Sequence, residues 1–567
     1  MIWKAVNTPQ KEIVEDLTSS LKISKPLASL LAQRGVYSYS TAKDFFRPTL
    51  ENLHDPFLMK DMRKAIDRIE DALSQGENIM IYGDYDVDGT TSVALVYSYF
   101  KNLKANCIAY IPDRYKEGYG LSIEGIDYAK HKNVSVLICL DCGIKAVEKV
   151  DYANSIGIDV IICDHHRPGE NVPKAVAVLD PKQEDCEYPY KELCGCAIGF
   201  KLIQAIQENI NQPFQELLPY LDLVVTAIGS DIVPITGENR ILAHFGLQVL
   251  NSNPRAGFKA LMGMVQKEQF NITDVVFIIG PRINAAGRME HGLEAVNLLI
   301  ENNHEKAVLK AKAIEEYNLD RRNTDQSITL EALEQIESLQ DQNRKTTVVY
   351  NESWHKGVIG IVASRLIETY YRPTLVFTKS GEYLAASARS VFSFDIYNAL
   401  EASSEFIEQF GGHKYAAGLT IREENYNSFK DKFEEVVSNQ IEDHQLIEKK
   451  IYDLEIELSD ITPKFFRILR QFGPFGPKNM KPIFRINALQ DTGYAKTVGK
   501  GNEHLKCKLF KDNLTNKFDA IGFNLGEKLK YLSNRSKVDV LFSIDENIWN
   551  GNTSLQLIIK DLRPHSS

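Results

Sequence analysis

The residues of this sequence that could do chemistry begin with three aspartates in one short segment. An apolar, strand-like run at residues 79–82 leads directly into Gly83-Asp84-Tyr85-Asp86-Val87-Asp88-Gly89. In an extended segment, residues i, i+2 and i+4 point to the same side. We therefore expect Asp84, Asp86 and Asp88 to converge on one point.

Two later apolar runs end in residues of the same kind. The run at 134–140 ends at Asp141, and the run at 158–163 ends at Asp164-His165-His166. Such runs alternate with helical stretches, which predicts a mostly parallel sheet with helices on both faces. Ligands bind open α/β sheets outside the carboxyl ends of the strands, so these side chains are expected at one edge.

Asp231 adds a further acidic position, after the apolar run at 221–228. Carboxylates at close range raise one another's pKa, so a cluster of this size needs cations. Carboxylate-rich ligand sets with one or two histidines favour Mn²⁺ or Mg²⁺ over zinc or copper. Five or six ligands suit two ions about 3.5–4 Å apart that share a carboxylate, activate water and neutralise phosphoryl charge. The sequence therefore predicts a two-metal site for phosphoryl chemistry.

Simpler interpretations exist for each residue alone. A single aspartate at a strand end usually caps a helix or forms a turn, and His-His pairs are common in surface loops. The Asp-x-Asp-x-Asp-Gly pattern also resembles the start of a calcium loop. That loop needs glutamate at position 12, and counting from Asp84 the sequence has Leu95 there. The recurrence of acidic residues at successive strand ends favours the metal site.

These motifs resemble, in the same order, the four signature motifs of the DHH phosphoesterase superfamily. The resemblance implies a DHH domain whose metal ligands are Asp86, Asp88, Asp141, His165 and Asp231. It also implies that Asp141 bridges two ions and that His166 faces the substrate phosphate. Asp84 would support the first motif or ligate directly.

Further motifs resemble those of the superfamily's exonucleases for single-stranded DNA. They occupy residues 111–121 and 280–288, and then 354–360, 372–374, 387–390 and 411–418, where they resemble the DHHA1 domain, which contacts substrate. The candidate substrate-binding residues within them are Arg114, Arg282, Asn284, Arg288, His355, Ser387, Arg389, Gly412 and His413.

Arginine suits a phosphate track because its planar guanidinium can bind phosphate oxygens through two hydrogen bonds. Gly411-Gly412 would let backbone N–H groups approach a phosphate closely. Taken singly, each arginine is more often a surface salt bridge and Gly-Gly a turn. By the resemblance, however, Arg114, Ser387 and Arg389 form a pocket for a 5′-terminal phosphate, which would give 5′-to-3′ polarity.

The sequence and the resemblance together predict an α/β chain of five segments. Residues 1–55 are expected to be helices packed on the next domain, 56–300 the parallel-sheet DHH domain with a further strand at 175–179, and 301–344 a connector helix. Residues 345–445 are expected to form a smaller α/β DHHA1 domain, and 446–567 a β-barrel of the oligonucleotide-binding (OB) type. The connector is marked by an apolar stripe of Ile328, Ala332, Ile336 and Leu339.

The last segment contains β-rich runs at 506–510, 538–544 and 554–559. Residues suited to stacking bases and tracking a backbone are Tyr494, Lys496, Lys500, Lys506 and Lys508. A junction at 473–482 resembles the family's, but has Lys478 where glycine is usual and Met480 where proline is usual. These departures leave the geometry of that turn open.

Composition limits the class of protein. A chain of 567 residues exceeds one hydrophobic core, and 44% hydrophobic with 25% charged residues is an ordinary globular composition. The formal charge of −10 argues weakly against nucleic acid, because charge can be unevenly distributed. No run approaches the roughly 20 apolar residues of a membrane span, and residues 1–17 lack the core of a signal peptide. We expect a cytoplasmic protein whose eight cysteines are buried, reduced thiols.

These features predict a metal-dependent 5′-to-3′ exonuclease that degrades single-stranded DNA to mononucleotides in recombination and repair. One alternative is a phosphodiesterase for cyclic dinucleotides or short oligonucleotides, against which the C-terminal β domain argues. The other is an inactive DNA-binding scaffold, which a lost acidic ligand would mark; none is missing. A helicase and a single-strand-binding protein are partners that the resemblance alone implies.

Overall fold

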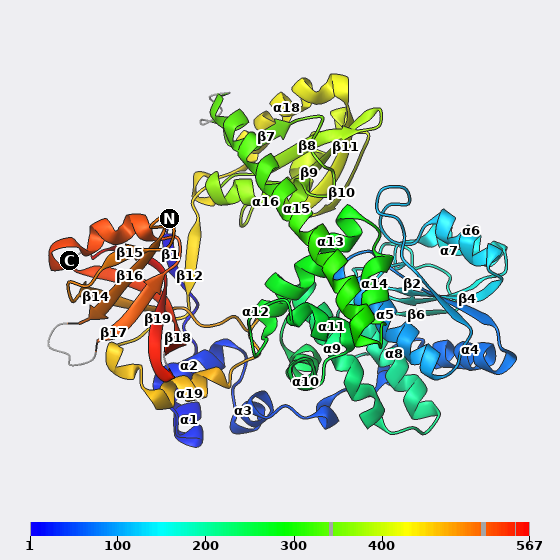
Figure 1. Cartoon of the computed structure of the whole chain (residues 1–567), viewed down its shortest axis with the longest axis horizontal. Coiled ribbons are helices and arrows are strands. Elements are labelled where there is room, and N and C mark those ends of the chain that lie inside the picture. Colours follow the sequence, from blue (N-terminus) through cyan, green and yellow to red (C-terminus); the bar gives the residue numbers. More distant parts are fainter. Residues whose placement is uncertain (1, 339–343, 512–516, 550, 566–567) are drawn as a thin grey trace.

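A computed structural model describes residues 2–338, 344–511, 517–549 and 551–565. Figure 1 shows an α/β body in blue to green, a smaller α/β body in yellow-green and a C-terminal β-rich body in orange and red. Among the described helices, none combines the length and the apolar composition needed to cross a bilayer.

The first body is built on a parallel sheet, as predicted, and this sheet has five strands. The strand order is β3-β2-β4-β5-β6. Their bounds are β2 Asn78–Gly83, β3 Cys107–Tyr110, β4 Val134–Leu140, β5 Asp159–Cys163 and β6 Ala177–Leu179. The sequence analysis did not predict β3, a four-residue strand at the edge of the sheet whose residues are mostly only half-buried.

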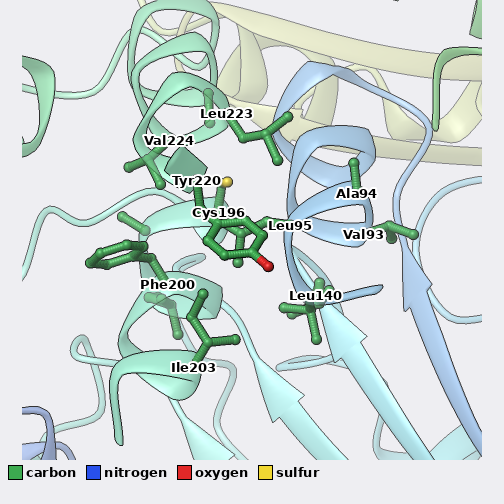
Figure 2. Packing of buried hydrophobic residues seen from close by; sticks show 14 of the residues in the cluster. Val93, Ala94, Leu95, Leu140, Cys196, Phe200, Ile203, Tyr220, Leu223 and Val224 are labelled. Carbon is green, nitrogen blue, oxygen red and sulfur yellow. The ribbon is translucent and has the colours of Figure 1, made fainter. Parts of the chain in front are cut away.

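Helices cover both faces of this sheet because successive strand residues point to opposite faces. Ile79 and Ile81 of β2 pack toward α4, α5 and α8, whereas Met80 and Tyr82 pack toward α6 and α7. Figure 2 shows the first of these cores, where Leu140 of β4 meets apolar residues of α5, α8 and α9. The helix bounds are α4 Met62–Gln75, α5 Val87–Asn102, α6 Ile123–His131, α7 Val147–Ser155, α8 Gly195–Asn209 and α9 Leu221–Ser230.

A helical part completes this body and leads into the connector. Its bounds are α10 Gly237–Ser252, α11 Ala256–Met262, α12 Ile272–Asp274, the π-helix η4 Val275–Ile279, α13 Gly280–Met289 and α14 Leu293–Leu299. The connector is α15, His304–Ser338. Ala311 and Ile314 of α15 belong to the core of the first body, and Ile328, Ala332 and Ile336 to that of the second. Leu339, expected in the same stripe, lies outside the described residues.

The second body has a mixed sheet in the order β10-β11-β9-β8-β7. The bounds are β7 Thr347–Tyr350, β8 Thr374–Ser380, β9 Tyr383–Arg389, β10 Gln409–His413 and β11 Ala416–Arg422. Its longer helices are α16 Ile359–Thr369 and α18 Tyr426–Gln440, with α17 Ile396–Glu401 between them in sequence.

The C-terminal body contains a closed barrel, which confirms the predicted OB-like fold. Strands β14, β18, β19, β17 and β16 pair in that order, and β14 also pairs with β16 to close the ring. The bounds are β14 Phe484–Asp491, β15 Lys496–Val498, β16 His504–Phe510, β17 Phe518–Gly522, β18 Val538–Trp549 and β19 Asn552–Pro564, preceded by β12 Lys449–Tyr452, β13 Leu454–Glu455 and α19 Pro463–Arg470.

The N-terminal segment packs differently from the prediction. Strand β1 (Ile2–Ala5) pairs in parallel with β12, and helices α1 (Lys11–Leu21) and α2 (Lys25–Gln33) share a core with the barrel. Only the end of the segment, including Leu50 and Leu53, packs on the first body. The prediction that residues 1–55 cover the next domain is therefore wrong for most of the segment. An amphipathic helix shows which face is buried but not which partner covers it.

The structure also bears on two local predictions, the state of the cysteines and the turn at 473–482. All eight cysteines are free and buried, as predicted. In the 473–482 junction, Lys478 adopts a left-handed backbone conformation with φ 61°. The turn thus has a conformation that favours glycine, although a lysine occupies it.

Candidate active site

Three neighbouring strands deliver the candidate ligands to one edge of the first sheet. Asp84 follows β2, Asp141 follows β4, and the Asp164-His165-His166 segment follows β5. These strands are adjacent and parallel, in the order β2-β4-β5. The side chains therefore meet at the carboxyl edge of the sheet, as the sequence predicts.

The first motif is not extended, so the predicted reason for its convergence is wrong. Helix α5 begins at Val87; Asp86 caps it by accepting the Gly89 N–H at 3.0 Å, and Asp88 lies in its first turn. A Cβ on Gly89 would stand 2.3 Å from the Asp84 carbonyl oxygen, so this sharp turn requires glycine. The chain turns into a helix directly after the strand, and the three aspartates are brought together by that turn.

The buried carboxylate of Asp88 is held by a second helix. It accepts the backbone N–H groups of Gly195 at 2.6 Å and Cys196 at 2.7 Å, in the first turn of α8. A Cβ on Gly195 would lie 2.6 Å from the Asp141 Cβ, so glycine also lets α8 approach the strand edge. These contacts fix where Asp88 points.

His165 lies at the centre of the cluster. Its Nε2 is 3.2 Å from Asp141 Oδ1, 3.5 Å from Asp231 Oδ2 and 3.8 Å from Asp88 Oδ2. Asp231 arrives from the C-terminal end of helix α9, not from a strand. Asp141 has a left-handed backbone, φ 59°, and such conformations are concentrated at functional sites.

Burial and mutual repulsion shift the pKa values of this cluster. Burial, followed by the charge of Asp86, raises the pKa of Asp88 to about 7. Burial and then Asp88 raise the pKa of Asp231 to about 8 and that of Asp141 well above its usual range. Burial, followed by the charge of His166, lowers the pKa of His165 to about 3. His165 is therefore a neutral imidazole, the form that binds metals.

The same side chains leave buried atoms without a hydrogen-bond partner among the described residues. These atoms are Asp84 Oδ2, Asp141 Oδ1, Asp231 Oδ2 and both ring nitrogens of His165. The ligand atoms of Asp88, His165 and Asp231 lie within 4.8 Å of one another, as do those of Asp141, His165 and His166. Unpaired lone pairs on crowded carboxylates and a neutral imidazole fit divalent cations with a preference for oxygen and nitrogen.

His166 is held in a different state. The carboxylate of Asp164 accepts hydrogen bonds from the N–H groups of Ile144 and His165, and Asp164 Oδ1 lies 2.8 Å from His166 Nδ1. Burial alone would lower the pKa of His166, but the hydrogen bond and charge of Asp164 outweigh it and raise that pKa to about 9. The imidazolium Nε2 lies 3.2 Å from the hydroxyl of Tyr119. No role was predicted for Asp164 or Tyr119 from the sequence.

Asp180 is a third residue to which no role was assigned from the sequence. It follows β6, is fully buried, and its Oδ2 has no partner among the described residues. Burial raises its pKa to about 7. The signal was present, because Asp180 ends the apolar run at 175–179 just as Asp141 ends its own strand.

Beside the cluster, a cavity of about 260 Å³ lies between the first and second bodies. The residues of the first body that line it include Tyr85, Tyr115 and Arg288. Arg114 also lines it and lies over the Tyr85 ring at 4.6 Å. From β9, Arg389 Nη1 donates to Ser387 Oγ at 3.2 Å. No acidic residue is among the described residues that line it.

The cavity is therefore cationic without an internal counter-charge. Burial lowers the pKa of Arg389. Burial followed by the charge of Arg114 lowers that of Arg288 to about 10, which leaves Arg288 protonated at neutral pH. Lys356 lines the same cavity. Arginines that converge on a small cavity in this way suit a phosphate group.

The other predicted substrate residues lie outside this cavity. Arg282 is paired with Glu315 at 2.6 Å and joins α13 to α15. Asn284 is on the same helix, and His355 stacks edge-on against Tyr115 with ring centroids 6.2 Å apart. Gly412 and His413 are exposed on the edge strand β10.

Comparison with known proteins assigns these bodies to families. The model of the DHH family N-terminal domain matches residues 78–228, that of the DHHA1 domain residues 343–439, and that of the RecJ OB domain residues 452–561.

Related proteins and solved structures support the same family assignment. The single-stranded-DNA-specific exonuclease RecJ of Bacillus subtilis is 35% identical over 99% of this chain and 70% of its own length. That of Salmonella typhimurium is 32% identical over 97% and 98%. The crystal structure of RecJ in complex with Mn²⁺ from Thermus thermophilus superposes with a TM-score of 0.85 at 26% identity, covering 100% of this chain and 80% of that one. Its complex with Mg²⁺ gives a TM-score of 0.80 at 25% identity, covering 100% and 79%. With this identity over almost its whole length and with the three domains in order, the chain belongs to the RecJ family of the DHH superfamily.

Proposed function

We propose that this chain is a metal-dependent exonuclease that hydrolyses single-stranded DNA from its 5′ end and releases mononucleotides. The observation that carries the proposal is the pairing of two sites. A cluster of unpaired buried ligand atoms around His165 lies beside a cationic cavity that contains Arg389. The names of the relatives, which are exonucleases specific for single-stranded DNA, support the substrate class.

The metal ions would be Mn²⁺ or Mg²⁺, the ions bound in the two related crystal structures. The residues that would hold two of them are Asp86, Asp88, Asp141, His165 and Asp231. When bound, such ions activate water and stabilise the attacking and leaving oxygens of a phosphodiester.

The protein's own groups account for binding and orientation. His166, cationic and fixed by Asp164, would hold a non-bridging oxygen of the scissile phosphate. Arg114, Ser387 and Arg389 would hold the 5′-terminal phosphate in the cavity. Water adds to the phosphorus, the bond to the 3′ oxygen breaks, and that oxygen takes up a proton. The shortened strand then carries a new 5′ phosphate, which is the group that the cavity binds.

The setting of this activity is a further part of the proposal. The OB-like barrel would bind the strand beyond the catalytic site, as such barrels do elsewhere. A role in recombination and repair would require partners that expose single strands, namely a helicase and a single-strand-binding protein. Eight free, buried thiols fit a reducing compartment and support a cytoplasmic location.

The test is a time course of Mn²⁺-dependent digestion of a long single strand labelled at its 3′ end, beside the matching blunt duplex. Progressive shortening of the single strand with the duplex intact is the expected result. Cleavage confined to cyclic dinucleotides or very short oligonucleotides would identify a small-substrate phosphodiesterase. Binding of the long strand without any cleavage would identify a scaffold.

A further inference from the structure

One loop reaches both the cationic cavity and the metal-ligand cluster. It spans residues 113–120, between β3 and α6. Arg114 and Tyr115 at its start line the cavity, and the Tyr115 hydroxyl donates to the Arg288 carbonyl at 2.5 Å. Tyr119 near its end lies 3.2 Å from His166 Nε2. The loop therefore contributes side chains to both sites.

The carboxylate of Glu117 holds the loop in place through three hydrogen bonds. Its Oε1 accepts the N–H of Asp113 at 2.7 Å, and its Oε2 accepts the hydroxyls of Tyr110 at 3.0 Å and Ser122 at 2.6 Å. Asp113 starts the loop, while Tyr110 and Ser122 belong to the strand before it and the helix cap after it. One side chain thus joins the beginning of the loop to the elements on either side.

Hydrogen bonds from Tyr82 also connect the end of the loop to the sheet. Tyr82 of β2 donates its hydroxyl to the Gly120 carbonyl at 2.8 Å and accepts the Ser122 N–H at 3.1 Å. Tyr82 and Tyr110 are register partners on paired strands, and their rings stack 5.3 Å apart. These contacts therefore hold the loop against the same sheet whose edge carries the metal ligands.

We infer that Glu117 is a positioning residue: by fixing the 113–120 loop, it sets the spacing between the terminal-phosphate cavity and the metal-ligand cluster, and so selects the first phosphodiester for hydrolysis. This inference rests on the proposed function. A strand held by its 5′ phosphate presents its first internal phosphodiester to the ligands only at one spacing. Displacement by about 1 Å can reduce a rate by about 100-fold.

The test compares Glu117→Ala and Glu117→Gln with the wild-type protein. Alanine removes all three acceptor contacts, whereas glutamine keeps the shape and one carbonyl oxygen. Glu124→Gln, the same change at an exposed position on α6, is the matched control. Tyr110→Phe removes a single contact and provides a second variant should Glu117→Ala fold poorly.

Three readouts separate positioning from mere stability. With a 5′-labelled strand, the first product should change from mononucleotide alone to a mixture that contains dinucleotides. The preference for a 5′-phosphate over a 5′-hydroxyl strand, as kcat/KM, should fall by about tenfold or more. Mn²⁺ affinity should stay as in the wild type. The effects should rank Glu117→Ala above Glu117→Gln, with Tyr110→Phe smaller and Glu124→Gln unchanged.

The inference is overturned if the Glu117 and Tyr110 variants release mononucleotides alone with an unchanged 5′-phosphate preference. It is also overturned if their activity on both strands falls equally, in step with a lower folded fraction. Failure of the wild-type protein to cut any strand would instead contradict the proposed function.

Discussion

At the scale of single residues, Asp141 combines three unusual properties. It is buried, it has a left-handed backbone, and its Oδ1 has no hydrogen-bond partner among the described residues. Each of these costs free energy in a protein without bound ions. Binding of a cation would offset that cost, because an ionised carboxylate is the group that a divalent ion requires.

Asp141→Asn is expected to abolish most of the cleavage while leaving the fold intact, because asparagine has the same shape and tolerates left-handed φ. Activity should fall by more than about 100-fold, since even residues outside the ligand set cost about 10–100-fold in metal sites. Isothermal titration with Mn²⁺ should show weaker binding. Asp151→Asn, the same change at an exposed position on α7, is the control. Full metal-dependent cleavage by Asp141→Asn would remove Asp141 from the site.

Lys201 carries a buried charge that serves the stability of the fold and has no part in the metal site. Its side chain is fully buried, and its Nζ lies 2.8 Å from Glu238 Oε1. Lys201→Met leaves the buried Glu238 without its counter-ion, although it keeps hydrogen bonds from the His54 N–H and the Tyr188 hydroxyl. The uncompensated charge should cost about 3–5 kcal/mol of unfolding free energy. Urea unfolding followed by circular dichroism measures this cost. Adding Glu238→Gln should recover part of it, and no recovery would show that the pair is not the cause.

The sequence predicts the identity of the central residues better than their geometry. Asp141 and His165 could be found because strand ends are visible as the ends of apolar runs. The direction in which the Asp88 carboxylate points could not, because it depends on the contact between α5 and α8, which are distant in sequence. The pairing of Arg282 with Glu315 could not be predicted either, because Glu315 belongs to the connector.

At the scale of elements, the junction between α15 and α16 positions the second body over the first. Asp325 of α15 is fully buried and pairs with Arg321 at 3.0 Å and with Arg365 of α16 at 2.6 Å. Helix α16 also carries Gly360, whose missing side chain leaves room for Ser387 and Arg389 of the cavity. The ion pairs thus connect the connector helix to one wall of the phosphate cavity.

Asp325→Ala should loosen this junction and leave two arginines without their partner. We expect KM for single-stranded DNA to rise by about 10-fold, the equivalent of about 1.4 kcal/mol, with a smaller change in kcat, because the metal ligands lie in the first body. Steady-state kinetics measures both. Glu334→Ala, at an exposed position on the same helix, should match the wild type. A fall in kcat with KM unchanged would contradict this role for the junction.

Elements differ in how visible they are in the sequence. Strand β4 coincides with its apolar run, and the connector stripe predicts α15 because a narrow period-3.6 pattern marks a helix between two bodies. Strand β3 was not predicted because four mostly half-buried edge residues give little hydrophobic alternation. Helices α1 and α2 are predicted as helices, but their partner is not, because the barrel that covers them lies far away, near the other end of the chain.

At the scale of the whole molecule, the two ends of the chain form one core. Leu27 and Leu30 of α2 pack in the same cluster as Phe465 and Phe472 of the C-terminal body. Strand β1 pairs with β12, in the segment that links the second and third bodies. The N-terminal helices therefore complete the C-terminal body.

Leu30→Ala should destabilise that C-terminal body by about 2–5 kcal/mol, the cost of a buried Leu→Ala change. Hydrogen exchange should rise in α2 and in the barrel strands, whereas exchange in β2 and β4 should stay as in the wild type. A uniform rise across all three bodies would show that they unfold as one unit and contradict this division.

On the proposed function, hydrolysis starts at a 5′ end held in the cationic cavity. The most direct measurement compares a linear 5′-phosphorylated single strand with its ligated circle, at equal concentration and with Mn²⁺. The linear strand should be degraded to mononucleotides, whereas the circle, which has no end to place in the cavity, should stay intact. Degradation of the circle at the rate of the linear strand would contradict the proposed function, because the protein would then be cutting without an end.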